Sequence, residues 1–288
     1  MIRSKIFFSL LMVGLLTACA EPQEAAKSED IQIETPVEST NEVVLAADIE
    51  WEKLNPARGD QSPQAGTIWG DRKGTVATGF LAKFVDGFSS PPHIHNVTYR
   101  ALVIKGMIHN DDPAAEKMWM PAGSFWTQPA GESHITAAKG EENIAYVEIS
   151  SGPYLVKPIE EASDNGERPI NIDKSNIVWL DASAVSWNKS DAKIAFLWEE
   201  ESENLSGKLL QLPAGFKGEI HTKSGAFRAV VIQGEPAYKI SKEAAAQSLA
   251  PGSSFSSEGA SIHRISSSTE ESTIYIRTDG EFDIVGEK

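Results

Sequence analysis

The sequence predicts an all-β fold built as two tandem barrels or sandwiches, and three observations support that prediction. The 288 residues include 22 Gly and 15 Pro, so the chain is interrupted too often for long helices. Segments rich in β-branched and aromatic residues lie between clusters of Gly, Pro, Asn and Asp, which is the pattern of short strands. The second half of the chain also repeats the first, which favours duplicated domains.

The clearest strands are expected at Thr98–Ile104, Ile144–Ile149, Ala226–Ile232 and Ser272–Arg277. Helical patterns are scarce, and the best short candidates are Glu160–Asp164 and Lys242–Leu249. Several short strands with regular turns are typical of a sandwich or a barrel.

The composition excludes several classes of protein. With 41% apolar and 23% charged residues, the chain is expected to fold. Its net charge of −15, from 26 Lys and Arg against 41 Asp and Glu, predicts no nucleic-acid partner. The single Cys rules out an internal disulfide framework and a Cys-rich zinc site.

Residues 1–18 are expected to form a signal peptide rather than part of the fold. Arg3 and Lys5 precede an apolar run of 11 residues, Ile6–Leu16, which is too short to span a bilayer as a helix. The run ends in Leu-Thr-Ala-Cys19, which is similar to the bacterial lipobox, where the chain is cut before the Cys and the Cys is acylated. The alternative is an ordinary secretory signal with an incidental Cys.

Residues 19–47 are expected to comprise the lipidated Cys19 and a disordered acidic tether. Between Ala20 and Ala47 there are seven acidic residues, one Lys and no hydrophobic period. Such a segment buries too little apolar surface to offset its ordering entropy. By resemblance to enterobacterial sorting, Ala20 after the Cys implies the outer membrane, with the protein facing the periplasm. The lipid would be the only membrane contact.

The internal repeat defines two units. Tyr99-Arg-Ala-Leu-Val-Ile-Lys-Gly106 matches Phe227-Arg-Ala-Val-Val-Ile-Gln-Gly234 at an offset of 128 residues. Nearly the same offset pairs His93 with His221 and His134 with His263. We therefore expect an N-terminal unit at 48–157, a linker at 158–174 and a C-terminal, degenerate unit at 175–288.

The first unit carries two spaced motifs. They read Gly87-x5-His93-x-His95-x3-Tyr99-x6-Gly106 and Gly123-x5-Pro129-x-Gly131-x2-His134. This spacing resembles the two cupin motifs, G-x5-H-x-H-x3-E-x6-G and G-x5-P-x-G-x2-H-x3-N. The resemblance implies two double-stranded β-helix, or jelly-roll, barrels that form a bicupin. The segment Met118–Gly131 is also similar to a bacterial bicupin family of unknown function that is compared with the cupin domain of the anti-sigma factor ChrR.

Strand geometry supports a metal site in this unit independently. Residues i and i+2 of a strand point to one face, so His93 and His95 should aim together into a barrel, and His134 on a distant strand would complete a set of three nitrogens. Three protein ligands with an open position are typical of a catalytic metal site, and imidazole suits several divalent metals. One divalent ion per chain, iron or zinc, is expected. The alternative is three barrel-lining histidines without a metal.

The chain departs from the cupin pattern at two positions. Tyr99 occupies the position of the usual Glu ligand, and Ala138 that of the usual Asn. Tyr99 shares strand parity with His93 and His95, so it should face inward as a phenolate ligand, as a hydrogen-bond donor or proton relay, or as a packing aromatic. Without the Glu, the site resembles the three-His cupins, several of which are Fe²⁺ dioxygenases.

Three other polar residues are not expected to be metal ligands. Arg100 and its repeat equivalent Arg228 have the opposite strand parity, so we expect them to point away from the metal and form structural ion pairs. His109 lies beyond Gly106 beside Asn110-Asp111-Asp112, which favours a surface-loop residue over a contact at the rim of the pocket.

The second unit has lost the motif. Lys223 replaces the second His, and an ammonium group repels a metal cation. The segment before His263 lacks the Pro, so this unit is expected to be metal-free and to serve as a structural partner for the first barrel or in a homodimer.

Two functions follow from the sequence. One is a mononuclear metal-dependent dioxygenase, or a related enzyme, acting on a small anionic or enolisable substrate. The other is a non-catalytic, ChrR-like metal- or ligand-binding or sensing cupin. Both need a small-molecule ligand, and a cupin fold alone does not decide between them.

Overall fold

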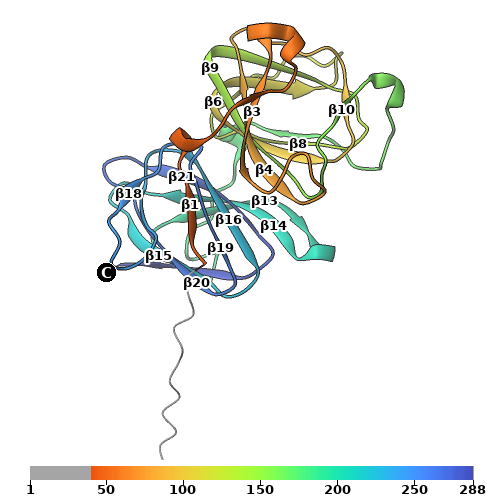
Figure 1. The fold of residues 1–288 in the computed structure, drawn as a ribbon. Helices are drawn as coiled ribbons and strands as arrows, with labels where there is room; N and C mark the ends of the chain where they lie inside the picture. Colours follow the sequence, from red (N-terminus) through yellow and green to blue (C-terminus); the bar gives the residue numbers. More distant parts are fainter. Residues whose placement is uncertain (1–39, 288) are drawn as a thin grey trace, which may run out of the picture. The chain divides into compact units, whose positions relative to one another are not determined.

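The computed structural model describes residues 40–287, in which twenty-two strands alternate with five short 3-10 helices (Figure 1). The all-β prediction is confirmed, and the four expected strands correspond to β6 (Tyr99–Asp111), β9 (Ile135–Ile149), β16 (Ala226–Gln233) and β21 (Ser272–Thr278), with Thr98 one residue before β6. The helix expected at Lys242–Leu249 is wrong, because this stretch is mostly exposed, has no apolar face to bury, and contains only the short strand β18. At Glu160–Asp164 the structure has a single turn, η3 (Ile159–Glu161).

The first barrel combines one large sheet with a two-stranded ribbon. The large sheet has the order β11-β8-β6-β9-β4-β3-β2, with β7 paired to β6, and the ribbon pairs β10 with β5. The strands of this half are β2 (Glu52–Lys53), β3 (Gln64–Trp69), β4 (Thr78–Phe84), β5 (Ile94–His95), β6 (Tyr99–Asp111), β7 (Met120–Pro121), β8 (Phe125–Gln128), β9 (Ile135–Ile149) and β10 (Val156–Lys157).

The second barrel has two six-stranded sheets, ordered β1-β19-β16-β21-β14-β13 and β12-β22-β15-β20-β17-β18. Its strands are β12 (Asn188–Lys189), β13 (Lys193–Glu200), β14 (Leu205–Leu212), β15 (Lys217–Thr222), β16 (Ala226–Gln233), β17 (Ala237–Lys239), β18 (Gln247–Ser248), β19 (Ser254–Glu258), β20 (Ser261–Ser266), β21 (Ser272–Thr278) and β22 (Phe282–Gly286).

Each barrel also receives a strand from the segment that precedes the other barrel. β1 (Glu42–Val44) pairs with β19 of the second barrel, beside which Figure 1 shows it, and β11 (Ile170–Ile172) pairs with β8 of the first. The expected disorder of the tether is therefore wrong at Glu42–Val44, and the linker contains the strand Ile170–Ile172. Both segments are short and partly apolar, and pairing satisfies backbone groups at what would otherwise be exposed sheet edges. Residues 1–39, with the expected signal peptide and Cys19, lie outside the described residues.

Apolar side chains form three clusters. One fills the first barrel, around Phe80, Val103 and Trp126, and a second fills the other barrel, around Phe227 and Ile274. The third joins side chains of both barrels, such as Leu102 and Val230. Strand β6 serves two of these clusters, since alternate side chains point to opposite faces: Val103 packs in the first barrel and Leu102 packs between the barrels.

Arg100 follows Tyr99 and Arg228 follows Phe227. Both arginines lie on the face that packs between the barrels. Arg100 stacks on the ring of Trp198 at 3.8 Å and lies 3.7 Å from Glu200. Arg228 pairs with Glu258 and lies 5.9 Å from the ring of Trp69. The expectation that both arginines form structural ion pairs away from the metal motif is confirmed.

Strand β6 bends at Gly106, which lets it pass from one part of the barrel wall to another. Gly106 has a φ of 74°, and a Cβ atom there would lie 2.1 Å from Oδ1 of Asn143. Only glycine fits both the backbone angle and the space. The strand pairs with β9 on both sides of this bend. No helix in residues 40–287 is long and apolar enough to cross a membrane.

Candidate metal centre

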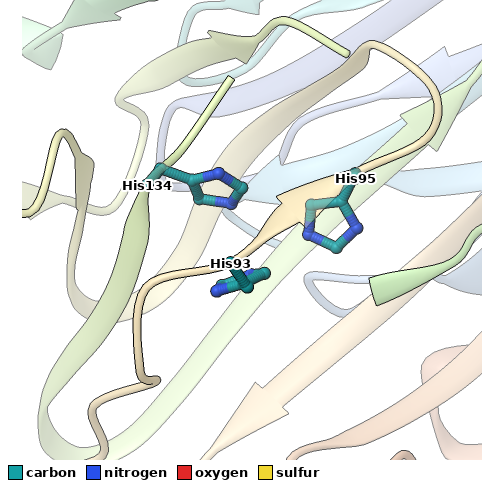
Figure 2. Close-up of side chains that lie close together, drawn as sticks. All are labelled: His93, His95 and His134. Carbon is teal, nitrogen blue, oxygen red and sulfur yellow. The ribbon is translucent and has the colours of Figure 1, made fainter. Parts of the chain in front are cut away.

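Three histidines converge inside the first barrel, as the sequence predicts. One ring nitrogen from each of His93, His95 and His134 lies within 4.8 Å of the others, and Figure 2 shows the three rings close together. Ring centroids are 4.3 Å apart for His93 and His134, 5.0 Å for His93 and His95, and 5.2 Å for His95 and His134.

Backbone pairing holds the histidines in this arrangement. His93 and His134 lie directly opposite each other in an antiparallel bridge, and each backbone N–H donates to the other's carbonyl at 3.0 Å. Directly opposite residues place their side chains on the same face. His95 lies two residues beyond His93, in β5, so strand alternation brings it to that face as well.

A backbone carbonyl orients each imidazole ring. Nδ1 of His93 lies 2.9 Å from the Pro91 carbonyl, Nδ1 of His95 lies 3.0 Å from that of Leu155, and Nδ1 of His134 lies 3.1 Å from that of Glu132. A carbonyl oxygen can only accept a hydrogen bond, so each Nδ1 carries the proton and each Nε2 keeps its lone pair as an acceptor. Metal-ligating histidines are usually oriented in this way.

The environment also keeps the three rings neutral. Burial lowers the pKa of all three imidazoles, and for His134 the value falls to about 3. At His95 the neighbouring rings of His134 and His93 lower the pKa further. Neutral imidazole is the form that binds a metal, so the donor set fits a divalent transition metal without any prior loss of protons.

No carboxylate joins the cluster in the described part of the chain, since the group consists of the three histidines alone. A metal held by three neutral ligands keeps its full positive charge. It also keeps open coordination positions, which distinguishes the arrangement from a closed structural site.

Tyr99, at the position of the usual Glu ligand, faces the same cluster. Its hydroxyl donates to Oδ1 of Asn110 at 2.9 Å and lies 3.4 Å from Nε2 of His134. Thr136 donates to the same Asn110 oxygen at 2.7 Å. Burial raises the pKa of Tyr99 above its usual value. These contacts favour a protonated tyrosine that acts as a hydrogen-bond donor over a phenolate ligand.

A second tyrosine at the site was missed by the sequence reasoning. The ring of Tyr154 stacks on His95, with centroids 4.3 Å apart and planes inclined by 18°, and its hydroxyl lies 3.1 Å from Nε2 of His95. Tyr154 sits in the loop between β9 and β10, outside both motifs. The only feature of the sequence that points to Tyr154 is its position as an aromatic residue directly after Ser151-Gly152-Pro153.

His93 and His95 face a cavity of about 380 Å³ with mainly apolar walls. His93, His95 and Tyr99 contribute polar atoms to its lining, and among residues 40–287 Arg58 is the one Lys, Arg, Asp or Glu there. The apolar part of the wall includes Phe80, Phe84, Phe88, Trp126, Val147 and Tyr154. A concave apolar site with a few convergent polar groups is typical of a small-molecule pocket.

His109 is not a surface-loop residue, so that expectation is wrong. It lies near the end of β6, opposite Ala137 of β9, and its side chain is buried beside Trp119. The strand was expected to end near Gly106, but it bends there and continues to Asp111. His109 does not join the three-histidine cluster.

The equivalent positions of the second barrel have other partners. Nε2 of His221 lies 2.6 Å from Glu219, and Lys223 pairs with Glu281 and Asp283 at 3.3 and 3.4 Å. His263 is fully buried between the hydroxyls of Tyr238 and Ser257, at 2.8 and 3.0 Å. The ring of Phe227, the counterpart of Tyr99, stacks on His263.

Solved structures share the fold over most of the chain. A candidate dioxygenase from Nostoc punctiforme has a TM-score of 0.66 and 13% identity, covering 88% of each chain. Oxalate decarboxylase from Lactobacillus farciminis has a TM-score of 0.55 and 11% identity, covering 85% of this chain and 88% of its own. The 7S globulin of Momordica charantia has a TM-score of 0.55 and 10% identity, covering 83% of this chain and 84% of its own.

At these identities the likeness establishes the tandem cupin fold and no activity. A search of curated proteins finds no match to this chain. A family model described as a domain of unknown function, DUF4437, matches residues 42–285, which include both barrels and the strand β1. The chain is therefore a tandem cupin that belongs to the DUF4437 family.

Proposed function

We propose that the first barrel binds one divalent metal ion, iron or zinc, through Nε2 of His93, His95 and His134. The observation that carries this proposal is the set of three Nδ1–carbonyl contacts, which leave Nε2 unprotonated on three clustered histidines. Packing alone does not require all three buried imidazoles to place Nδ1 against a backbone carbonyl. A metal ion would give that orientation and the neutral state of the rings a common purpose.

We further propose that the protein is a metal-dependent oxygenase for a small anionic or enolisable substrate. A divalent metal in this site would supply a Lewis acid with open positions for an oxygen-bearing substrate and for O₂ or water. The chain would supply the rest: apolar walls that exclude water, and the hydroxyls of Tyr99 and Tyr154, which lie next to the nitrogen ligands and can hold a proton for the bound substrate. A site without a carboxylate ligand favours an anion.

A non-catalytic, ChrR-like binding or sensing role is the second candidate. It is favoured by one observation: the cavity wall contains no Asp or Glu, and its histidines are those assigned to the metal. Among residues 40–287, those that line the cavity therefore include no carboxylate that could act as a separate general base. A protein that only binds a metal and a ligand would need none.

Metal analysis combined with oxygen uptake separates these candidates. The purified protein would be loaded with Fe²⁺ or Zn²⁺ and offered a β-diketone, a catechol and a thiol, with an oxygen electrode as the readout. Oxygen uptake by the iron form and none by the zinc form would support the oxygenase. Tightly bound zinc with no turnover of any probe would support the binding role, and failure to bind either metal would contradict both.

We also propose that the protein works in the cell envelope, anchored by acylated Cys19. The proposal rests on the sequence Leu16-Thr17-Ala18-Cys19 after an apolar run. Cys19→Ser should move the protein from the membrane fraction to the soluble fraction and abolish labelling by radioactive palmitate. Unchanged fractionation and labelling would contradict the lipid anchor.

A further inference from the structure

We infer that Arg58 is the anion-binding residue of the cavity and that the ligand is an organic carboxylate with an apolar body. On this assignment, the carboxylate of the ligand pairs with the Arg58 guanidinium, while the apolar body lies against the aromatic wall. The inference rests on the proposed function only in placing the ligand beside the metal centre, and it adds the chemical class of that ligand.

Arg58 is set apart from the other arginines by its lack of an acidic partner. Every other arginine in residues 40–287 lies within 4.0 Å of a carboxylate oxygen: Arg72, Arg100, Arg168, Arg228, Arg264 and Arg277. Arg58 has no such contact in that range, although the protein has a net charge of −15. Asp60, two residues away, pairs with Lys53 at 3.0 Å instead.

The guanidinium is nevertheless held in place. Its carbon lies 4.9 Å from the centre of the Phe88 ring, and one of its nitrogens lies 3.5 Å from the Ser89 carbonyl. Arginine stacks readily on aromatic rings while leaving its in-plane N–H groups free. Arg58 is thus positioned, but its fork of donors still lacks the planar anion that it fits best.

Arg58 lies at the outer part of the pocket. It comes from η2 (Pro56–Gln61) and is half-buried, whereas His95 and His134 are buried. The wall that Arg58 and His95 share also includes the aromatic side chains of Phe80, Phe88 and Trp126. A ligand with an apolar middle can therefore reach from Arg58 toward the histidines without leaving a buried charge unpaired.

The absence of acidic residues from the cavity wall also selects for an anion. None of the side chains that line the cavity is Asp or Glu, so a carboxylate meets no like charge there. A cationic ligand would be repelled, because its positive charge would lie close to the Arg58 guanidinium. Neutral apolar molecules would fit the wall but gain nothing from the guanidinium.

Ligand titration tests the inference with phenylacetate and its neutral analogue phenylacetamide as probes. Binding is followed by calorimetry and by the change in tryptophan fluorescence, to which Trp126 in the cavity wall contributes. We expect wild-type protein to bind phenylacetate about tenfold more tightly than phenylacetamide, which corresponds to one charge-assisted pair. Arg58→Gln should remove this preference, and Arg58→Lys should keep part of it because the charge remains.

Lys157→Gln is the matched control, since it removes a positive charge next to the cavity residue Val156, at a residue that pairs with Glu161 and lies outside the cavity wall. It should leave the preference unchanged. If Arg58→Gln keeps the wild-type preference, or if wild-type protein binds neither probe at millimolar concentration, the inference is overturned. Circular dichroism would establish that the variants are folded.

Repeating the titration with and without Zn²⁺ separates this inference from the proposed function. A preference that depends on Zn²⁺ and not on Arg58 would mean that the metal holds the carboxylate, which supports the metal site and overturns the role of Arg58. A preference that depends on Arg58 in a protein that binds no Zn²⁺ would support the role of Arg58 and contradict the metal site.

Discussion

At the scale of single residues, the site depends on the hydrogen bonds that orient the three imidazole rings as well as on the rings themselves. His93, His95 and His134 each give their Nδ1 proton to a backbone carbonyl, which fixes both the tautomer and the ring orientation. The motif spacing predicts which histidines converge. It does not predict the acceptors, because the Leu155 carbonyl reaches His95 from a loop 60 residues further along the chain.

Tyr99→Phe tests whether the tyrosine is a ligand or a hydrogen-bond donor. The hydroxyl donates to Asn110, and burial disfavours the phenolate, so the variant should keep the full metal content of the wild type. Loss of this buried hydrogen bond should lower the free energy of unfolding by about 1 kcal/mol. Elemental analysis and urea unfolding measure the two effects, and a metal-free variant with normal stability would show that Tyr99 is a ligand.

At the scale of elements, two strands cross between the halves of the chain. β1 precedes the first barrel but extends a sheet of the second, where Val43 lies opposite Phe255 of β19. Neighbouring contacts strengthen this pairing, since Thr40 donates to the Glu258 carbonyl at 2.7 Å and the Ala46 amide donates to Ser253 at 3.0 Å. The crossed strands protect sheet edges that would otherwise be free to pair with another chain.

Removing β1 should therefore destabilise the second barrel and leave the metal site intact. A chain that starts at residue 49 loses several hydrogen bonds and the burial of Val43, and we expect it to lose about 3 kcal/mol of stability and to self-associate. A chain that starts at residue 40 is the control and should behave like the longer protein. Equal thermal stability of the two truncated chains would contradict the structural role of β1.

At the scale of the whole described molecule, residues 40–287, the two barrels share a buried polar cluster. Glu148 is 2% exposed and accepts hydrogen bonds from Tyr146 at 2.9 Å and from Tyr275 of the second barrel at 2.7 Å. Arg277 lies 3.9 Å away, and burial raises the pKa of Glu148. Tyr146 and Tyr275 are repeat equivalents, so the duplication has brought matching side chains to a single acid.

Glu148→Ala should strongly destabilise the pairing of the barrels. It leaves two buried hydroxyls and the Arg277 guanidinium without their acceptor, at an expected cost of about 3 kcal/mol. Glu148→Gln keeps one acceptor oxygen and nearly the same volume, so its loss should be smaller. Urea unfolding measures both, and an alanine variant as stable as the glutamine variant would contradict this account of the interface.

The sequence predicts the barrels and the three ligands because both depend on local periodicity and a long repeat. It does not predict the crossed strands or Tyr154, since three-residue strands and a lone loop aromatic carry no periodic signal. His109 was misplaced because a strand that bends at Gly106 resembles a strand that ends there. Arg58 stands in an irregular turn, and its lack of an acidic partner becomes visible only once every other arginine has been placed.

The central claim is that His93, His95 and His134 hold a divalent metal, and metal stoichiometry tests it most directly. We expect about one equivalent of zinc or iron per chain in the wild type and nearly none in His93→Ala, since losing one of three ligands removes most of the affinity. His221→Ala changes the equivalent residue of the second barrel and should keep the full equivalent. A His93→Ala protein that retains as much metal as His221→Ala would contradict the assignment.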